Sequence, residues 1–319
     1  MVSRVQDMSA LRRSARSAAR SGRRGGVQYR WYVPYLFLVP GLALYGLWML
    51  YPLVYEFYIS FFDWKILPGQ TSTFIGLANY ERALNDPVFW SSLRNTVLYT
   101  VITVIGQMIF GMAVAIMVHR VAIGKKFFRI VYYLPVVSSW VVVSFLFQFL
   151  FSADAGGIIN YILGGSVLGL IDRPIAWLNS ANTAWIAIYA LAIWKGIGWS
   201  MVIFLAALQG IPVELYEAAA IDGAGGWKQF TRVTLPMIRR TTMFVAVLLV
   251  IGGFQAFLAI YLMTGGGPIN RTQVVLGYMY RSAFGDLNFG YGAALSYLLA
   301  AIIVVANFTQ MRLFNRAED

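Results

Sequence analysis

The chain has 319 residues, of which 59% are hydrophobic and 12% are charged, and its net charge is +12. Soluble globular proteins are usually about 45–50% apolar and about 25% charged. The apolar residues of this chain therefore exceed what one soluble core buries, and the composition is typical of a polytopic membrane protein. The absence of cysteine excludes disulfides and thiolate sites. The single histidine, His119, argues against a histidine-based metal site or catalytic triad, and we expect it to be an interfacial residue at the end of a span.

Residues 1–30 are rich in arginine, serine and glycine and hold eight of the 25 basic residues. This composition predicts a disordered, basic cytoplasmic tail that contacts anionic lipid heads. The segment lacks the apolar run of a cleavable signal peptide. Because so much of the positive charge lies in this tail, a membrane surface is the expected partner, and nucleic acid is not.

Six runs that are poor in charge are long enough to cross a bilayer as helices at about 1.5 Å per residue. They are approximately Val33–Phe62, Val97–Val118, Val131–Phe151, Ala184–Leu208, Met243–Met263 and Tyr291–Met311. The first contains Pro40, Pro52 and Glu56, so a kink or an early exit is expected there. The fourth contains one charge, Lys195. The sequence therefore predicts an all-α polytopic membrane protein with six transmembrane helices.

The positions of lysine and arginine predict the orientation of these helices. Eighteen of them lie in the N-terminal tail, the loop at 119–129, the loop at 210–240 and the C-terminal tail, whereas six lie on the other side. The positive-inside rule then places both termini and residues 210–240 in the cytoplasm.

We divide the chain accordingly into four parts. Residues 1–30 are the basic tail, 31–92 the first transmembrane helix with an extracytoplasmic loop, 93–312 the core transmembrane domain and 313–319 a cytoplasmic tail. Three loops of roughly 30 residues face outward and are too short to fold alone, so a separate soluble partner is expected to make the first capture of any external solute. They are about Asp63–Ser92, Ser152–Thr183 and Thr264–Gly290.

The stretch ELYEAAAIDGAGGWKQFTRVTLP, residues 214–236, separates the fourth and fifth apolar runs. Pro212 suits a first helical turn, Glu214 and Glu217 suit a helix N-terminus, and Gly223 can end the helix. The predicted structure is a short helix, a turn at Gly225 and Gly226, and a second short stretch over 227–234. Its composition leaves two interpretations open: a helix that docks on a basic partner, or an interfacial helix that lies on lipid.

The spacing Glu217-Ala218-Ala219, three residues, Gly223, nine residues, then Val233-x-Leu235-Pro236 resembles the EAA loop of bacterial binding-protein-dependent ABC importer permeases. Valine stands where isoleucine is usual in that loop. The stretches FIGLANYERALND, NTVLYTVITV, RIVYYLP, TGGGP and YGAALSYLL fall in the order and spacing of the carbohydrate-uptake branch, which includes the maltose and glycerol-3-phosphate permeases. The resemblance covers about Tyr32–Phe308.

The resemblance implies a type I ABC importer permease fold in the bacterial inner membrane, with the EAA loop as a coupling helix inserted in a cleft of a cytoplasmic ATPase subunit. Glu217 would face basic groups of that cleft, Ala218, Ala219 and Gly223 would allow a close fit, and Asp222 would help to hold the loop. The implied partners are a second homologous permease subunit, two copies of the ATPase, an extracytoplasmic solute-binding protein and a carbohydrate.

This chain itself is expected to bind no cofactor, and ATP and Mg would be used by the partner ATPase. A phosphate-binding loop of the form G-x-x-x-x-G-K-[ST] is absent from the sequence. The nearest stretch, AIGKKFF at 122–128, lacks the first glycine and the final Ser or Thr. We therefore predict a permease subunit and not an enzyme.

Polar and aromatic residues inside a bilayer usually mark the path of a transported solute. Two stretches that contain such residues flank the predicted coupling loop, AIWKGIGWSM in the fourth span and IGGFQAF in the fifth. The resemblance carries Lys195, Gly196, Trp199, Gly253 and Ala256 onto solute-site positions, and the residues themselves add Trp194 and Gln255. The alternatives are that the tryptophans pack or lie at an interface, that Lys195 pairs with a neighbouring subunit, and that the glycines serve tight helix packing.

Two other classes of membrane protein were weighed. An ion-gradient-driven carrier for a small polar solute usually needs carboxylates inside the membrane, yet the spans offer only Glu56 near an end, and no clear inverted repeat is present. A membrane enzyme would need paired carboxylates or a histidine at a span, and these are scarce. The ATP-driven importer subunit is therefore the favoured prediction.

Overall fold

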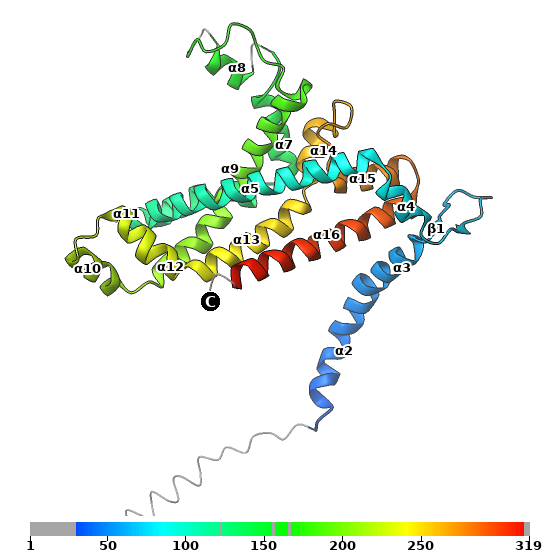
Figure 1. Cartoon of the computed structure of the whole chain (residues 1–319), viewed down its shortest axis with the longest axis horizontal. Coiled ribbons are helices and arrows are strands. Elements are labelled where there is room, and N and C mark those ends of the chain that lie inside the picture. The colour runs from blue at the N-terminus through cyan, green and yellow to red at the C-terminus, as the bar shows by residue number, and fades with distance from the viewer. Residues whose placement is uncertain (1–29, 122, 155–156, 165–166, 316–319) are drawn as a thin grey trace, which may run out of the picture. The chain divides into compact units, whose positions relative to one another are not determined.

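The computed structural model describes residues 30–121, 123–154, 157–164 and 167–315 (Figure 1). The predicted tail at 1–30 lies outside these residues except for Arg30, as do positions 316–319 of the predicted C-terminal tail. Contacts between Cα atoms divide the chain into two units, Met1–Glu56 and Phe57–Asp319. Each unit is described by itself.

The apolar helix near the N-terminus consists of α2 (Val33–Tyr45), a π-helical turn (Gly46–Leu50) and α3 (Tyr51–Ile59). The π-turn ends two residues before Pro52, which has no N–H to donate to the preceding turn, so the regular ladder is disturbed there. The helix ends at Ile59, three residues before the predicted end at Phe62.

The three longest helices correspond to the second, fourth and sixth predicted spans and extend beyond them. They are α5 (Pro87–Arg120), α9 (Ala181–Gln209) and α16 (Phe289–Asn315). The start of α5 is fixed by Asp86, whose side chain accepts a hydrogen bond of 2.8 Å from the backbone N–H of Val88. His119 lies in the last turn of α5, as predicted.

The third predicted span, Val131–Phe151, was wrong as a single helix. It is a bent pair, α6 (Lys125–Val137) and α7 (Trp140–Leu150), whose axes meet at 94°. Pro135 removes a backbone donor near the end of α6, and the Ser139 side chain caps α7 by accepting from the N–H of Val141 at 3.3 Å. These two residues end one helix and begin the next.

The fifth predicted span, Met243–Met263, is also two helices. α13 (Arg239–Phe254) is followed by a separate α14 (Leu258–Thr264), and the chain turns at Phe257, whose φ and ψ are −148° and −62°. Gly252 and Gly253 weaken the helix just before this break, since glycine costs about 1 kcal/mol relative to alanine in a helix.

A second bent pair precedes α13. α10 (Val213–Ile221) is followed by α11 (Gly226–Gln229), a π-helical turn (Phe230–Thr234) and α12 (Leu235–Met237), and the segment 226–237 meets α13 at 70°. Among the described residues, four helices are long and apolar enough to cross a membrane, or up to six if each bent pair is one span. This agrees with the predicted all-α membrane fold.

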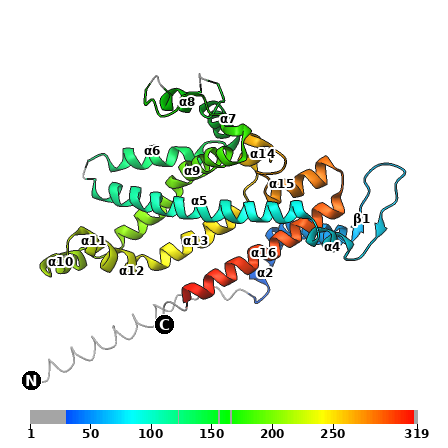
Figure 2. The ribbon, with the colours of Figure 1, turned by 45° about the horizontal axis from the view of Figure 1, so that its top comes forward.

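In the second unit α5 packs against α9, which crosses it at an angle in Figures 1 and 2. Small residues allow the close approach: a Cβ added to Gly106 would lie 2.5 Å from Ile193 Cδ1, and one added to Gly111 would lie 2.5 Å from the Cβ of Ser200. α6 packs against α9 as well, while α13 contacts both α5 and α16.

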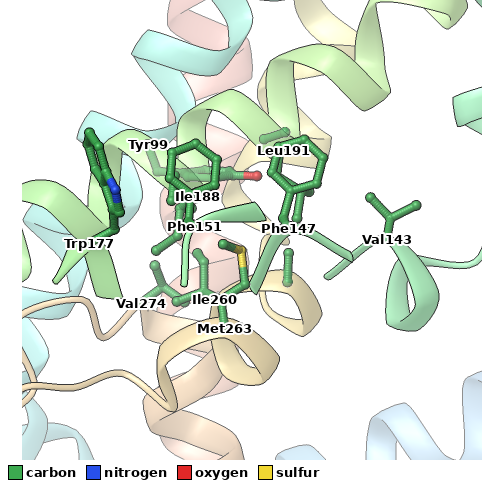
Figure 3. Close-up of a cluster of buried hydrophobic side chains, with 13 residues drawn as sticks. Tyr99, Val143, Phe147, Phe151, Trp177, Ile188, Leu191, Ile260, Met263 and Val274 are labelled. Atoms are coloured by element: carbon green, nitrogen blue, oxygen red, sulfur yellow. The ribbon is translucent and has the colours of Figure 1, made fainter. Parts of the chain in front are cut away.

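A cluster of buried apolar side chains joins α5, α7, α9 and α14 (Figure 3). Tyr99, Phe147, Phe151, Ile188 and Ile260 lie in it, and Trp177 from a short 3-10 turn (Trp177–Asn179) packs edge-on against Phe151 at a centroid distance of 5.5 Å. The cluster holds the base of the loop that contains α8 (Ile158–Leu163).

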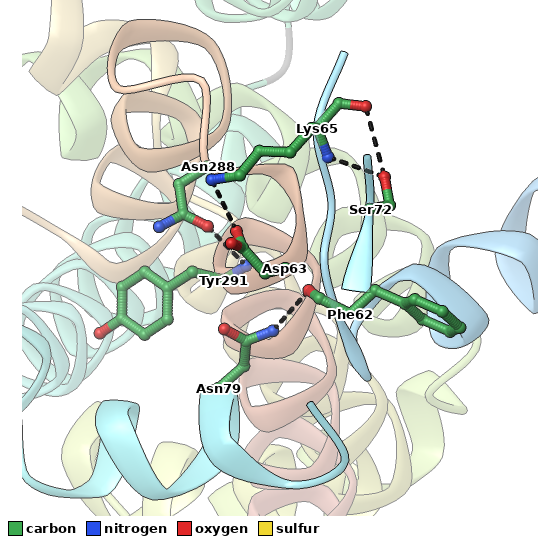
Figure 4. A network of polar contacts seen from close by, with 7 residues as sticks. All are labelled: Phe62, Asp63, Lys65, Ser72, Asn79, Asn288 and Tyr291. Carbon is green, nitrogen blue, oxygen red and sulfur yellow. Dashed lines mark hydrogen bonds and ion pairs between the residues drawn. The ribbon is translucent and has the colours of Figure 1, made fainter. Parts of the chain in front are cut away.

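A polar network fastens the loop after the first apolar helix (Figure 4). The Asn79 amide of α4 (Ala78–Leu84) donates to the carbonyls of Ser60 at 2.9 Å and Phe62 at 3.0 Å, and Lys65 pairs with Asp63 at 2.9 Å. β1 (Phe62–Asp63) and β2 (Thr73–Phe74) form an antiparallel pair here. The sequence did not predict these strands, because two residues are too few to show a periodicity.

Candidate functional site

The helix that carries the predicted coupling residues is α10, and its ends explain why it is so short. Pro212 precedes the first helical residue with ψ of 133°, one position earlier than its predicted place in the first turn. At the other end Gly223 has a φ of 75°, and the N–H groups of Gly223 and Ala224 donate to the carbonyls of Ala220 and Ala219 at 3.0 and 2.8 Å. This is a Schellman end, so Gly223 stops the helix as predicted.

None of the α10 side chains is buried within the chain. Glu217 and Ala218 are exposed and Ala219 is half-buried, while Ile221 is 88% exposed and Trp227 on α11 is 75% exposed. Within the part of the chain that the structure describes, Glu217 forms no ion pair. A carboxylate next to exposed large apolar groups is a surface suited to a protein partner.

The segment from α10 to α12, residues 213–237, is held to the rest of the unit at a few points. The Tyr216 hydroxyl lies 2.9 Å from Thr234 Oγ1, the Gln229 amide donates to the carbonyl of Ala224 at 3.1 Å, and Ile238 is buried in a cluster with α5 and α9. A largely apolar cavity of about 1050 Å³ lies between α10–α12 and the ends of α5 and α9. The segment therefore rests on defined contacts and not on continuous packing.

Lys195 of α9 is buried, with 4% of its surface exposed. Its ammonium group donates to the backbone carbonyls of Pro135 at 2.7 Å, Val136 at 3.2 Å and Ser138 at 2.7 Å. It also lies 4.9 Å from the ring centroid of Trp140. All these partners stand at the break between α6 and α7, so the ammonium has one carbonyl for each of its three hydrogens.

The glycines predicted to border the solute path pack against α5. A Cβ added to Gly196 would lie 2.0 Å from Oε1 of Gln107, and one added to Gly253 would lie 2.7 Å from Cγ2 of Thr100. Thr100 and Gln107 are seven residues apart, which places them on one face of α5. The structure thus brings residues of α9 and α13 together on that face.

Gln107 is the polar residue of this face that the sequence reasoning missed. It is half-buried within the predicted second span. An amide inside an otherwise apolar run, here VIGQMIF, is the signal that could have identified it.

The remaining predicted path residues occupy different environments. Trp194 is 42% exposed and its ring lies 5.6 Å from that of Phe147, whereas Trp199 is half-buried against the cluster around Phe204. Gln255 is exposed at the end of α13, and Ala256 packs on the cluster of Figure 3.

A carboxylate at the opposite end of α5 is fully engaged inside the chain. Asp86 Oδ2 accepts from the hydroxyls of Tyr278 in α15 (Val275–Tyr280) at 2.5 Å and Tyr291 in α16 at 2.6 Å. Burial raises the pKa of the Asp86 carboxyl, but these bonds and two from backbone N–H groups outweigh burial and hold the pKa below its ordinary value.

The family model described as binding-protein-dependent transport system inner membrane component matches residues 107–318. The chain is 34% identical over 289 residues to the probable ABC transporter permease protein YurN of Bacillus subtilis, covering 90% of this chain and 97% of that protein. It is 35% identical over 280 residues to the lactose transport system permease protein LacF of Rhizobium radiobacter, covering 86% and 92%.

The fold is also that of a subunit in a crystal structure of a bacterial alginate ABC transporter in complex with an alginate pentasaccharide-bound periplasmic protein. The TM-score is 0.76 at 21% identity, covering 90% of this chain and 95% of that chain. The two bent pairs, the long helices and the sequence matches point the same way. The chain belongs to the binding-protein-dependent transport system inner membrane components, the permeases of ABC transporters.

Proposed function

We propose that this chain is the transmembrane permease subunit of an ATP-driven ABC importer that moves a carbohydrate across the bacterial inner membrane by alternating access. In this proposal α10 docks on a separate ATPase subunit, which binds ATP and Mg and hydrolyses the nucleotide. A second homologous permease, two ATPase copies and an extracytoplasmic solute-binding protein complete the transporter.

The observation that carries this proposal is that α10 is exposed and ends at a defined residue, Gly223. The side chains of Glu217, Ile221 and the nearby Trp227 are exposed. Such a surface, with large apolar groups beside a carboxylate, is typical of an interface from which the partner protein is missing. The Schellman end at Gly223 keeps the helix short and stiff, which suits the transmission of a movement.

Carbohydrate as the substrate class is supported by LacF, whose name records lactose transport. The solved transporter of the same fold is complexed with a periplasmic protein that holds an alginate pentasaccharide, which supports a secreted binding protein as the partner that makes the first capture. The short outer loops of this chain agree with such a division of labour.

For the solute path we propose the face of α5 on which Gln107 meets Gly196 and Thr100 meets Gly253. Trp194, Trp199, Gln255 and Ala256 continue this path in the proposal. Gln107 and Gln255 supply amides for hydroxyl groups, and indole rings stack on the apolar faces of sugars. In this proposal Lys195 borders the path without bonding to the solute, which the three bonds from its ammonium group to carbonyl groups support.

The decisive experiment reverses the charge of Glu217. In Glu217→Lys we expect the ATPase subunits to copurify poorly and solute uptake to fall, because a lysine would face the basic groups expected in the ATPase cleft. The matched control is Asp172→Lys, which reverses an exposed charge on the outer side. Unchanged copurification and unchanged uptake in Glu217→Lys would refute docking through α10.

The same preparation separates the proposal from a gradient-driven carrier. Proteoliposomes that contain both permeases and the ATPase, with the solute-binding protein added on the opposite side, should take up solute only with ATP supplied on the ATPase side. Uptake in ATP-free vesicles that carry an ion gradient would favour the carrier instead.

A further inference from the structure

The break between α6 and α7 creates a physical problem inside a membrane. The last carbonyls of a helix have no partner within it, and lipid hydrocarbon offers no donors. Pro135 and the 94° turn expose such carbonyls within a stretch of apolar sequence. A broken span at this place therefore needs donors from elsewhere in the protein.

The structure supplies those donors from the side chains of Lys195 and Ser138. The Ser138 hydroxyl donates to the carbonyl of Leu134 at 3.0 Å, and Ser139 caps the start of α7. Lys195 bonds to the next carbonyls, those of Pro135, Val136 and Ser138. The positive charge also faces the negative end of the α6 dipole and the Trp140 ring, which compensates for the burial of the ammonium.

A close backbone contact accompanies this arrangement. A Cβ added to Gly198, one turn beyond Lys195, would lie 2.1 Å from the carbonyl oxygen of Tyr132 in α6. α7 continues the connection outward, because the Gln148 amide donates to the carbonyl of Leu262 in α14 at 2.7 Å. Lys195 thus lies where α9 contacts both α6 and α7.

We propose that Lys195 is a positioning residue that clamps the α6–α7 break to α9, so that α6, the start of α7 and α9 move as one body during transport. We call this set, Lys195 with the carbonyls of Pro135, Val136 and Ser138, the Lys195 clamp. α9 continues for about 15 residues, roughly 22 Å, to the turn before α10. The consequence that movement of α10 reaches α7 rests on the proposed function; the clamp itself does not.

The clamp is tested with two spin labels in the purified chain in lipid nanodiscs. The sequence has no cysteine, so Val142→Cys on α7 and Ile186→Cys on α9, at side chains 66% and 53% exposed, take labels at those sites alone. We expect a narrow distance distribution with Lys195 present. In Lys195→Met it should become roughly twofold wider, as for a segment released from its tertiary contacts.

Ser200→Ala is the matched control, because the Ser200 hydroxyl is buried on α9 and has no hydrogen-bond partner among the described residues. It should keep the narrow distribution. If Lys195→Met is not recovered from membranes, Lys195→Gln replaces it, since an amide keeps donors and loses the charge, and an intermediate width is expected. An unchanged width in the variant that is measured overturns the clamp.

The complete transporter tests whether the clamped parts move together. With ATP and vanadate added to the complex, the distance between the two labels should stay constant in the presence of Lys195 and should shift in its absence. A distance that changes with Lys195 present refutes movement as one body. Because the nanodisc measurement needs no ATPase, its failure leaves the docking of α10 untouched, and a failure of the Glu217→Lys test leaves the clamp untouched.

Discussion

Lys195 and Glu217 are 22 residues apart on consecutive helices, yet the chain surrounds them in opposite ways. Lys195 is 4% exposed and bonds to three carbonyl groups. Glu217 is exposed and has no ion-pair partner among the described residues. The first charge holds helices of this chain together, and the second is presented outward.

This contrast teaches how a permease subunit uses its few charges. Within the bilayer an unsatisfied charge is too costly, so Lys195 must be bonded inside the chain to exist there. Outside the bilayer, water satisfies an exposed carboxylate until a protein partner replaces the water. A charged side chain that bonds to groups of its own chain therefore indicates a structural role. An exposed charged side chain without such bonds, on a helix with defined ends, indicates an interface with another protein.

The largest expected effect comes from reversing the buried charge. Lys195→Glu would place an anion against three carbonyl oxygens, and breaking a buried charged arrangement typically costs about 3–5 kcal/mol. We expect little monodisperse protein after extraction, measured by fluorescence-detected size exclusion. A yield and profile equal to those of the parent chain would show that Lys195 is not held by these carbonyls.

The next effect concerns the backbone contact beside the lysine. In Gly198→Val the new Cβ would meet the Tyr132 carbonyl, which is backbone and cannot move aside, so a loss of about 1–3 kcal/mol in stability is expected. Gly252→Ala is the control, because nothing lies within 4 Å of the added Cβ. Thermal unfolding in detergent measures both. Equal melting temperatures for the two variants would contradict close packing of α6 on α9.

Asp86 extends the comparison to a carboxylate that has internal partners. Its folded-state pKa is depressed below the ordinary value of 3.8, so its contribution to stability is present above that value and is lost as the pH falls through the folded-state pKa. We expect Asp86→Asn, which keeps the capping oxygen, to be less stable than the parent at pH 7 and to lose less stability on acidification. Melting temperatures from pH 7 to 3 measure this. Parallel curves would remove Asp86 as a source of acid sensitivity.

The smallest effect on stability is expected at Ile221, the last residue of α10. The same residue is expected to have a large effect on binding of the ATPase subunit. Ile221→Ser should change the free energy of unfolding of the isolated chain by no more than about 0.5 kcal/mol, because the side chain is 88% exposed. If the ATPase buries Ile221, its loss should weaken capture of the ATPase about tenfold or more.

Ile123→Ser is the matched variant, since Ile123 is 90% exposed in the loop between α5 and α6. Binding of immobilised ATPase subunit to each variant gives the comparison. Equal capture of both would show that Ile221 is not part of the interface.

The sequence predicted the fold class and the short helix that ends at Gly223 well, because both rest on local signals. A run of apolar residues, the end of a helix at Gly223 and the spacing of an EAA loop are readable one residue after another. The breaks at Ser138–Ser139 and at Phe257 were missed, since hydropathy stays high across them. Pro135, Gly252 and Gly253 were visible but were not weighted as helix breakers.

The contacts of Lys195 and Gln107 could not be predicted for another reason. Each contact depends on which group of a distant helix lies opposite the side chain. The carbonyl groups that Lys195 contacts are 57–60 residues away in the sequence. The pattern identified Lys195 as unusual and assigned it to the solute path, but only the arrangement of α6, α7 and α9 shows its carbonyl partners. Polar residues in spans are thus easy to notice and hard to interpret without the tertiary structure.

The 70° bend between the segment 226–237 and α13 has a mechanical consequence. Ile238 lies at the corner and is 2% exposed. At about 1.5 Å per residue the segment 226–237 and α13 are roughly 18 and 24 Å long. If the bend stays rigid while these two arms rotate about Ile238, the far end of α13 travels about one third farther than the far end of the segment 226–237. The far end of α13 carries Gly253, next to Thr100 on the proposed solute path.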